Sequence, residues 1–148
     1  MRIGFVIALS LITQSCLTRT NNQDDWDKNN LRDLEVDDPR VQWAYKATQD
    51  SLIFYIDYFK RFYGQENYSF FLKKNFEDGG EFEHMWSRPF EINEIGFKCI
   101  LDNKPSGLKN YSLGDTVQID FKDIEDCIIV TADTTIIGNY LQKELADN

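Results

Sequence analysis

The sequence has little histidine, cysteine or proline: one, three and three residues among 148. With His84 as the only histidine, a metal site built on two or more histidines of one chain is excluded. No phosphate-binding loop, nucleophile elbow or dinucleotide-binding glycine motif occurs in the chain. The sequence therefore predicts no cofactor and no metal site.

Positive charge is also scarce, with 16 lysines and arginines against 25 aspartates and glutamates and a net charge of −9. Nucleic acids and anionic lipid headgroups attract positively charged surfaces, so this balance argues against both as partners. The acidity is concentrated after Gly64, where 16 acidic residues face 8 basic ones. An apolar fraction of 42% with 14% aromatics is enough for a packed core, which excludes a disordered protein.

The chain begins with a short apolar run, residues 3–12, which follows Met1 and Arg2. Ten residues of helix rise about 15 Å, half of the hydrocarbon thickness, so the run is too short to cross a membrane. A positive start, an apolar run and Ser15 before Cys16 are typical of a secretory signal, and the cysteine resembles the lipid-bearing residue of bacterial lipoproteins. Thr13 departs from that pattern, which prefers leucine there. The alternative is a buried N-terminal strand or helix.

Three regions follow from this interpretation. Residues 1–15 are predicted to be a lipoprotein-type signal peptide, with Cys16 as the lipidated mature N-terminus. Residues 16–37 are rich in Asn and Asp and lack an apolar period, which predicts a polar, acidic tether. Residues 38–148 are predicted to form one domain. We therefore expect an exported protein, held by its lipid anchor at a periplasm-facing membrane, the outer membrane or the cell surface.

A long amphipathic helix is predicted to begin at Asp38 and Pro39. The Asp38 carboxylate can accept free amides of the first turn, proline suits the first helical position, and Gly64 can end the helix in a left-handed conformation. Between them, apolar-face residues recur every three or four positions: Val41, Tyr45, Thr48, Leu52, Tyr55, Ile56, Phe59 and Phe62. We expect this face to pack on a core. The alternative, a partner-binding or membrane-surface helix, lacks the usual lysine-rich polar face.

The remaining chain predicts about five short strands separated by turns. The predicted strands cover residues 68–76, 81–87, 93–101, 117–121 and 127–131, and a short final helix covers residues 139–145. A helix followed by strands at this spacing predicts an α+β fold, in which the long helix packs on a small, strongly bent antiparallel sheet or barrel.

Six short segments together resemble a known bacterial family. They are Phe71-Leu72-Lys73, Glu83-His84-Met85-Trp86, Leu101-Asp102-Asn103-Lys104-Pro105, Gly114-Asp115-Thr116-Val117, Ile124-Glu125-Asp126 and Gly138-Asn139-Tyr140. Their order and spacing resemble the YegJ-like family, domain of unknown function 2314, over about residues 39–145. The family has no established activity, so the resemblance implies no reaction. Cys127 stands where the family usually has tryptophan, and Cys99 stands near a usual glycine.

The resemblance makes His84 the best single functional candidate, as a general base or as a polar anchor in a groove. Strand alternation places Glu81 and Glu83 on the face opposite His84, so they are not expected to join it in one site. Trp86 shares the His84 face, and we expect it in the core rather than as a ligand platform. The alternative for His84 is a half-buried strand histidine bonded to the backbone.

Cys99 and Cys127 are the two cysteines left if Cys16 carries lipid. An exported protein meets an oxidising compartment, and both cysteines lie in predicted strands, so we predict a Cys99–Cys127 disulfide. The alternative is two free buried thiols. Nothing in the sequence lowers the pKa of either thiol, which argues against a nucleophilic cysteine.

An acidic cluster lies between residues 115 and 126: Asp115, Asp120, Asp123, Glu125 and Asp126. It lacks the glycine-punctuated spacing of a calcium loop, so a solvated edge is expected rather than a metal site. Asp126 belongs to one of the six segments, and we predict it as a candidate binding residue together with His84 and Trp86.

Two function classes fit these observations. The first is a non-enzymatic exported lipoprotein whose domain binds a protein or envelope component, and it is favoured because one histidine without a convergent nucleophile is a poor catalytic inventory. The second is a hydrolase-like enzyme that uses His84 with a carboxylate. A third reading, an immunity or inhibitor protein for a basic toxin, fits only the acidity.

Overall fold

The computed structural model describes residues 37–132 and 134–146. The predicted signal peptide, Cys16 and almost all of the tether lie outside the described residues. In chain order the elements are α2 (Pro39–Phe62), β1 (Tyr68–Asp78), β2 (Glu81–Ile92), β3 (Gly96–Leu101), β4 (Thr116–Asp120), a 3-10 turn η1 (Phe121–Asp123), β5 (Asp126–Thr131), β6 (Thr134–Gly138) and α3 (Tyr140–Ala146). The predicted α+β class is confirmed. Within the described part of the chain, no helix is long and apolar enough to cross a membrane.

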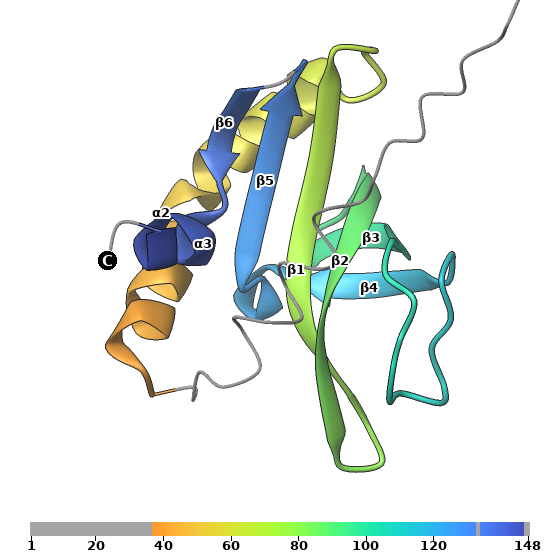
Figure 1. Ribbon diagram of the computed structural model, residues 1–148. Helices are drawn as coiled ribbons and strands as arrows, with labels where there is room; N and C mark the ends of the chain where they lie inside the picture. The colour runs from red at the N-terminus through yellow and green to blue at the C-terminus, as the bar shows by residue number, and fades with distance from the viewer. Residues whose placement is uncertain (1–36, 133, 147–148) are drawn as a thin grey trace, which may run out of the picture. The chain divides into compact units, whose positions relative to one another are not determined.

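The strands form one open antiparallel sheet in the order β4-β3-β2-β1-β5-β6 (Figure 1). Five strands were predicted, and a barrel was one of the two expected forms. The sheet has six strands and stays open, because β4 and β6 lie at its two edges instead of pairing with each other. The missed strand, β6, carries the run Thr134 to Ile137, in which every residue is β-branched. That run is itself a strand signal.

Helix α2 begins where the sequence predicts. The Asp38 carboxylate accepts the Arg40 amide at 2.8 Å and also pairs with the Arg40 guanidinium. These hydrogen bonds lower the pKa of Asp38 to about 2. At the other end Gly64 adopts φ +84°, the left-handed conformation that ends a helix at low conformational strain.

The buried face of α2 is shifted slightly from the predicted one. Ala44 is buried there, while Tyr45 is exposed and donates its hydroxyl to the Lys122 carbonyl at 2.8 Å. Next to it, Thr48 donates to the Glu125 carbonyl, and Gln49 donates to two further carbonyls of the same link. One side of the helix therefore binds the backbone of residues 121–125 through polar side chains, which apolar periodicity alone does not reveal.

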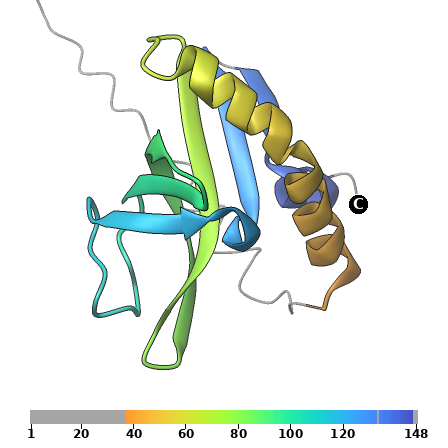
Figure 2. The same cartoon turned by 180° about the vertical axis from the view of Figure 1, so that it is seen from behind.

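The rest of the helix face packs on the inner face of the sheet, which we define as the face toward α2 (Figure 2). Tyr55 and Phe59 each make edge-to-face contacts with Phe70 on β1 and with Phe97 on β3, at centroid distances of 5.3 to 5.8 Å. In the sheet, β2 lies between β1 and β3. Tyr55 and Phe59 can therefore contact both β1 and β3 only if the sheet curls around the helix.

Strand β2 provides the place for this curl. Its pairing with β1 ends at Ser87, and its pairing with β3 becomes irregular between Pro89 and Glu91. Proline has no amide hydrogen to donate, so in sheets it is confined to edges and bulges. Beyond Ser87, β2 therefore no longer pairs with β1. The strands that follow it, β3 and β4, cross the direction of β5 (Figure 1). The predicted strong bend is present.

The core contacts predict a stability difference between two changes at Tyr55, which is fully buried and donates its hydroxyl to the Phe71 carbonyl. Tyr55→Phe removes only the hydrogen bond and should lower the free energy of unfolding by about 1 kcal/mol. Tyr55→Ala removes the ring and should lower it by about 3 to 5 kcal/mol. Urea unfolding measures both. Phe54→Ala, at an exposed position of the same helix, is the control, and an equal loss in Tyr55→Ala and Phe54→Ala would contradict this account of the core.

Candidate functional site on the outer face of the sheet

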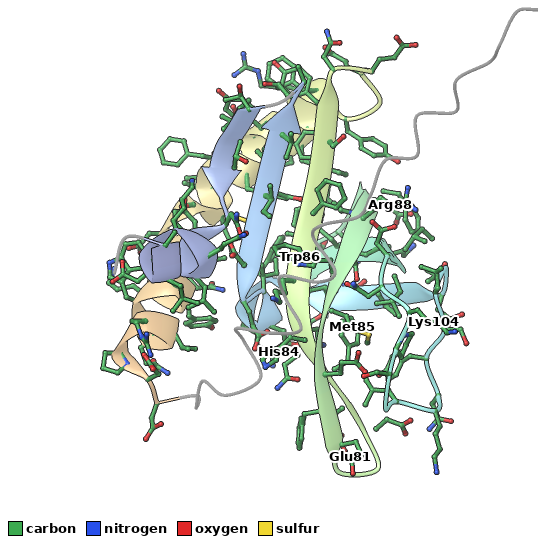
Figure 3. The ribbon with its side chains drawn as sticks, in the orientation of Figure 1. Glu81, His84, Met85, Trp86, Arg88 and Lys104 are labelled. Carbon is green, nitrogen blue, oxygen red and sulfur yellow. The ribbon has the colours of Figure 1, made fainter. Side chains whose placement is uncertain are left out.

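Strand β2 alternates as the sequence predicts. Met85 and Ser87 are buried on the inner face, while His84 and Trp86 lie on the opposite, outer face (Figure 3). The expectation that Trp86 belongs to the core is wrong: it is half-buried, and the neighbouring Met85 fills the core instead. The two predicted binding residues of β2 therefore share an accessible face of the sheet.

A row of three side chains crosses this outer face. Strand register places Lys73 of β1 opposite Trp86 of β2 on one side and opposite Asp126 of β5 on the other. Lys73 is only 8% exposed, and its ammonium lies 5.3 Å from the centroid of the Trp86 ring, a cation–π contact. We call Trp86, Lys73 and Asp126 the outer row. The structure thus brings two predicted residues together around a lysine that sequence analysis did not single out.

Asp126 is buried at the end of this row, contrary to the expected solvated edge. Its Oδ1 accepts the amides of Cys127, Asn139 and Tyr140 at 2.8, 3.1 and 3.5 Å. Burial raises the pKa of the Asp126 carboxyl to about 6, although these amides and the nearby Lys73 ammonium oppose the rise. Asp126 therefore changes its charge close to neutral pH, which an exposed aspartate does not.

A glycine makes this arrangement possible. Gly138 has φ +90°, and a Cβ placed there would lie 1.3 Å from the Cys127 carbonyl oxygen, so no other residue fits. Asn139 follows, also in the left-handed region at φ +59°. The two residues turn the chain between β6 and α3 so that successive amides point at the Asp126 carboxylate.

His84 lies beside the outer row and pairs with a carboxylate. Its Nδ1 is 2.7 Å from Oε2 of Glu125, and the side chain is 46% exposed. His84 therefore differs from both predictions: it is not a half-buried histidine bonded to the backbone, and it is not enclosed in a groove. As predicted, Glu83 lies on the other face, where it accepts the amides of Ser106 and Gly107. Sequence analysis missed Glu125 as the partner because the two residues are 41 positions apart.

The segments that carry the family resemblance meet at this face. Asn103 accepts the Trp86 amide through its side-chain oxygen, and Arg88 forms an ion pair of 2.9 Å with Asp102. Lys73, His84 and Asp126 each come from a different one of these segments. Outer-face contacts therefore connect five of the six segments, all except the one that begins at Gly114.

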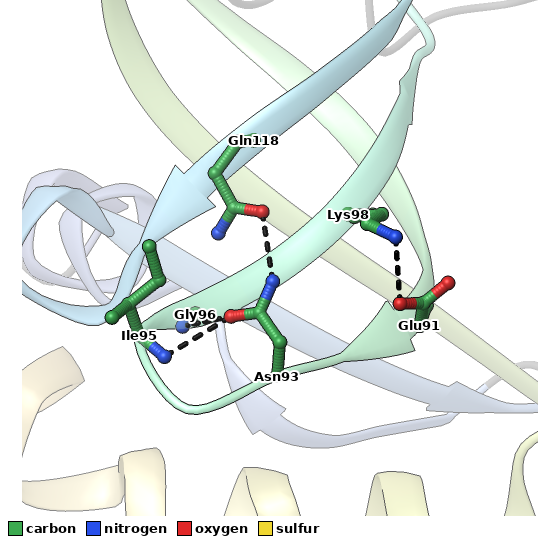
Figure 4. A network of polar contacts seen from close by, with 6 residues as sticks. All are labelled: Glu91, Asn93, Ile95, Gly96, Lys98 and Gln118. Atoms are coloured by element: carbon green, nitrogen blue, oxygen red, sulfur yellow. Dashed lines mark hydrogen bonds and ion pairs between the residues drawn. The ribbon is translucent and has the colours of Figure 1, made fainter.

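A second polar network lies at the β2–β3 turn and has a structural role. Asn93 accepts the amides of Ile95 and Gly96 and donates to Gln118, and Lys98 pairs with Glu91 nearby (Figure 4). These groups satisfy one another and fix the turn.

Among residues 37–132 and 134–146, no group of three or more His, Cys, Asp or Glu side chains could hold a metal ion.

Cys99 and Cys127 are free and fully buried, so the structure does not contain the predicted disulfide. In the sheet, β1 and β2 separate the strands that carry the two thiols. Burial raises the pKa of the Cys99 thiol to about 12 and raises that of Cys127 still further. Both cysteines therefore behave as small core residues rather than as nucleophiles.

Residues 38–148 match the family model described as "Uncharacterized protein conserved in bacteria (DUF2314)". The chain belongs to this family. The match confirms the resemblance to domain of unknown function 2314, while the YegJ-like designation and the lipoprotein form stay predictions. No curated protein and no solved structure matches the chain.

The buried carboxylate of this DUF2314 domain predicts an unusual pH dependence. The folded chain binds the Asp126 proton more tightly than the unfolded chain, whose carboxyl has the ordinary pKa of 3.8. Ionised Asp126 therefore destabilises the fold above about pH 6, and this penalty is removed as the pH falls toward 3.8. Asp126→Asn keeps the Oδ1 acceptor and stays neutral throughout.

We expect the free energy of unfolding of the wild type, minus that of Asp126→Asn, to rise by up to about 3 kcal/mol between about pH 7 and about pH 4. Urea unfolding at several pH values measures this slope. The test is the change of this difference with pH. A difference in the free energy of unfolding that is the same at every pH would reflect only the loss of a charge beside Lys73. A difference that stays flat or falls with decreasing pH contradicts the assignment.

Proposed function

We propose that this protein is a non-catalytic binding domain, exported as a lipoprotein, which recognises a protein or an envelope component through the outer face of its sheet. The observation that carries the proposal is that the predicted binding residues His84 and Trp86 share one face, beside the buried Asp126. Binding surfaces work best when their side chains are held in place before the partner arrives. Lys73, Glu125 and the amides of residues 139 and 140 hold these three side chains in that way.

The membrane anchor is part of this proposal. Cys16, placed after a positive start and a short apolar run, would carry the lipid, and residues 16–37 would tether the domain to the membrane. The proposal places the domain at a periplasm-facing membrane or on the outer membrane or cell surface. An acidic domain is repelled by anionic headgroups, so the anchor rather than the domain surface would contact lipid.

The anchor predicts lipid labelling that depends on one cysteine. When the full chain is expressed in a bacterium fed with a radioactive fatty acid, the wild type should be labelled and Cys16→Ser should not. Cys99→Ser, at a buried core cysteine, is the control and should keep the label. Equal labelling of the wild type and Cys16→Ser, or no label in either, contradicts the lipoprotein form.

A second function, a hydrolase-like enzyme, is favoured by one observation. The 2.7 Å contact between His84 and Glu125 is the geometry in which a carboxylate orients a histidine as general base. The His84 side chain lies on an open surface, however, and its one recorded polar contact among the described residues is this carboxylate. A hydrolase would lose activity in both His84→Ala and Glu125→Gln and keep it in Glu66→Gln, at an exposed acidic residue after α2.

The binding function predicts that capture of a partner depends on the outer face. Tagged full-length protein is purified from solubilised envelopes of the native bacterium, and co-purifying components are quantified by mass spectrometry. A component enriched with the wild type should fall at least about tenfold with His84→Ala and with Trp86→Ala. It should be retained with Trp43→Ala, which removes a half-exposed tryptophan from α2. Equal capture by all four proteins contradicts the proposal.

A further inference from the structure

The β1–β2 hairpin extends beyond the rest of the sheet. Strand β5 pairs with β1 only as far as Lys73, and β3 pairs with β2 only from Ser87 onward. Between these limits, residues 74–86 form strand pairs only with one another. At the tip, Gly79 and Gly80 have φ values of +63° and +90°, as a tight two-residue hairpin turn requires. A hairpin of two strands is marginally stable without further support.

The support comes from the loop between β3 and β4, through two carboxylates of the hairpin. Asp78 accepts the amides of Lys109 and Asn110 at 2.7 and 2.8 Å, and Glu83 accepts two amides at residues 106 and 107. The hydrogen bonds to the loop amides lower the pKa of Asp78. Charge-assisted hydrogen bonds of this kind are stronger than neutral ones. The loop is thus fixed to the hairpin on both sides of its tip.

Apolar contacts complete the support on the inner face. Tyr111 of the loop packs edge-to-face on Phe76 of β1 with ring centroids 5.3 Å apart. Leu108, also in the loop, is 5% exposed and belongs to the core cluster. The loop therefore covers the inner face of the hairpin.

The tip of the hairpin presents an exposed aromatic ring among negative charges. Phe82 is 66% exposed and lies opposite Glu77 in the strand register. The tip, residues 77–83, contains four carboxylates and no lysine or arginine. Asp78 and Glu83 hold the loop. Glu77 lies on the same face as Phe82 and accepts the Gly80 amide, and Glu81 is exposed next to Phe82 in the chain but on the opposite face. Figure 3 shows Glu81 at the end of the projecting hairpin.

We propose that this braced hairpin tip inserts Phe82 into an apolar pocket of a partner protein whose rim carries lysine or arginine. The inference rests on the proposed binding function and names the partner of the same outer face, because Phe82, His84 and Trp86 alternate along β2. A rigid projection loses little conformational entropy on docking, and opposite rim charges speed association and select the partner. An anionic membrane has the wrong charge to fit the tip.

The experiment places a photo-crosslinking phenylalanine analogue, benzoylphenylalanine, at position 82 of the full chain in the native bacterium. Position 54 on α2 is the matched control, since Phe54 is 63% exposed and lies on another element. Irradiation at position 82 should give one cross-linked protein, whose cross-linked segment is apolar with flanking lysine or arginine. Glu81→Lys should reduce this product at least about tenfold, and Glu66→Lys, at an exposed acidic residue after α2, should leave it unchanged.

The other outcomes separate this inference from the proposed function. If His84→Ala abolishes partner capture but position 82 gives no cross-link, the hairpin inference is overturned and the binding function stands. A cross-linked segment with net negative charge, or a product insensitive to Glu81→Lys, overturns the charge match. Cross-links from position 54 alone overturn the hairpin as the docking element. If capture is insensitive to the outer face and position 82 gives no product, both proposals fail.

Discussion

The packing of Tyr55 and Phe59 against both Phe70 and Phe97 is the constraint on which the rest of the structure depends. One short stretch of helix touches two strands that a third strand separates, so the sheet has to curl around α2. Edge-to-face aromatic contacts add to the large apolar area that such rings bury. The irregular pairing at Pro89 lets β2 follow this curl. The inner face is thereby filled, and His84 and Trp86 lie on the outer face.

The outer face shows how that arrangement can support binding. Lys73 and Asp126 are opposite charges on neighbouring strands, both largely buried, and Trp86 lies over the lysine. Burying charges in this way is weak evidence for stability, because replacing such a pair with apolar residues is often neutral or stabilising. The proposed binding function gives this ordered polar row a role, which is to position Trp86 beside the exposed His84.

Much of the fold could be predicted from the sequence, because local signals set it. Asp38, Pro39 and Gly64 mark the ends of α2, and alternation assigns Met85 and His84 to opposite faces. The site could be predicted only in part. The pairing of His84 with Glu125 and the burial of Asp126 depend on strand order and on the turn at Gly138, which sequence periodicity does not encode. Strand order is also the reason that the predicted disulfide is absent. In the sheet, β1 and β2 lie between the strands of Cys99 and Cys127, and the sequence does not reveal this order.

The inner face of β2 packs in the core, and we propose that its outer face serves recognition. Adjacent residues of that strand test this division directly. The measurement is the free energy of unfolding, by urea, of His84→Ala and Met85→Ala. A half-exposed ion pair contributes little, so His84→Ala should lose less than about 1 kcal/mol. Met85 is fully buried, so Met85→Ala should lose about 2 to 5 kcal/mol. Equal losses in the two variants would show that His84 serves the fold, which contradicts the account.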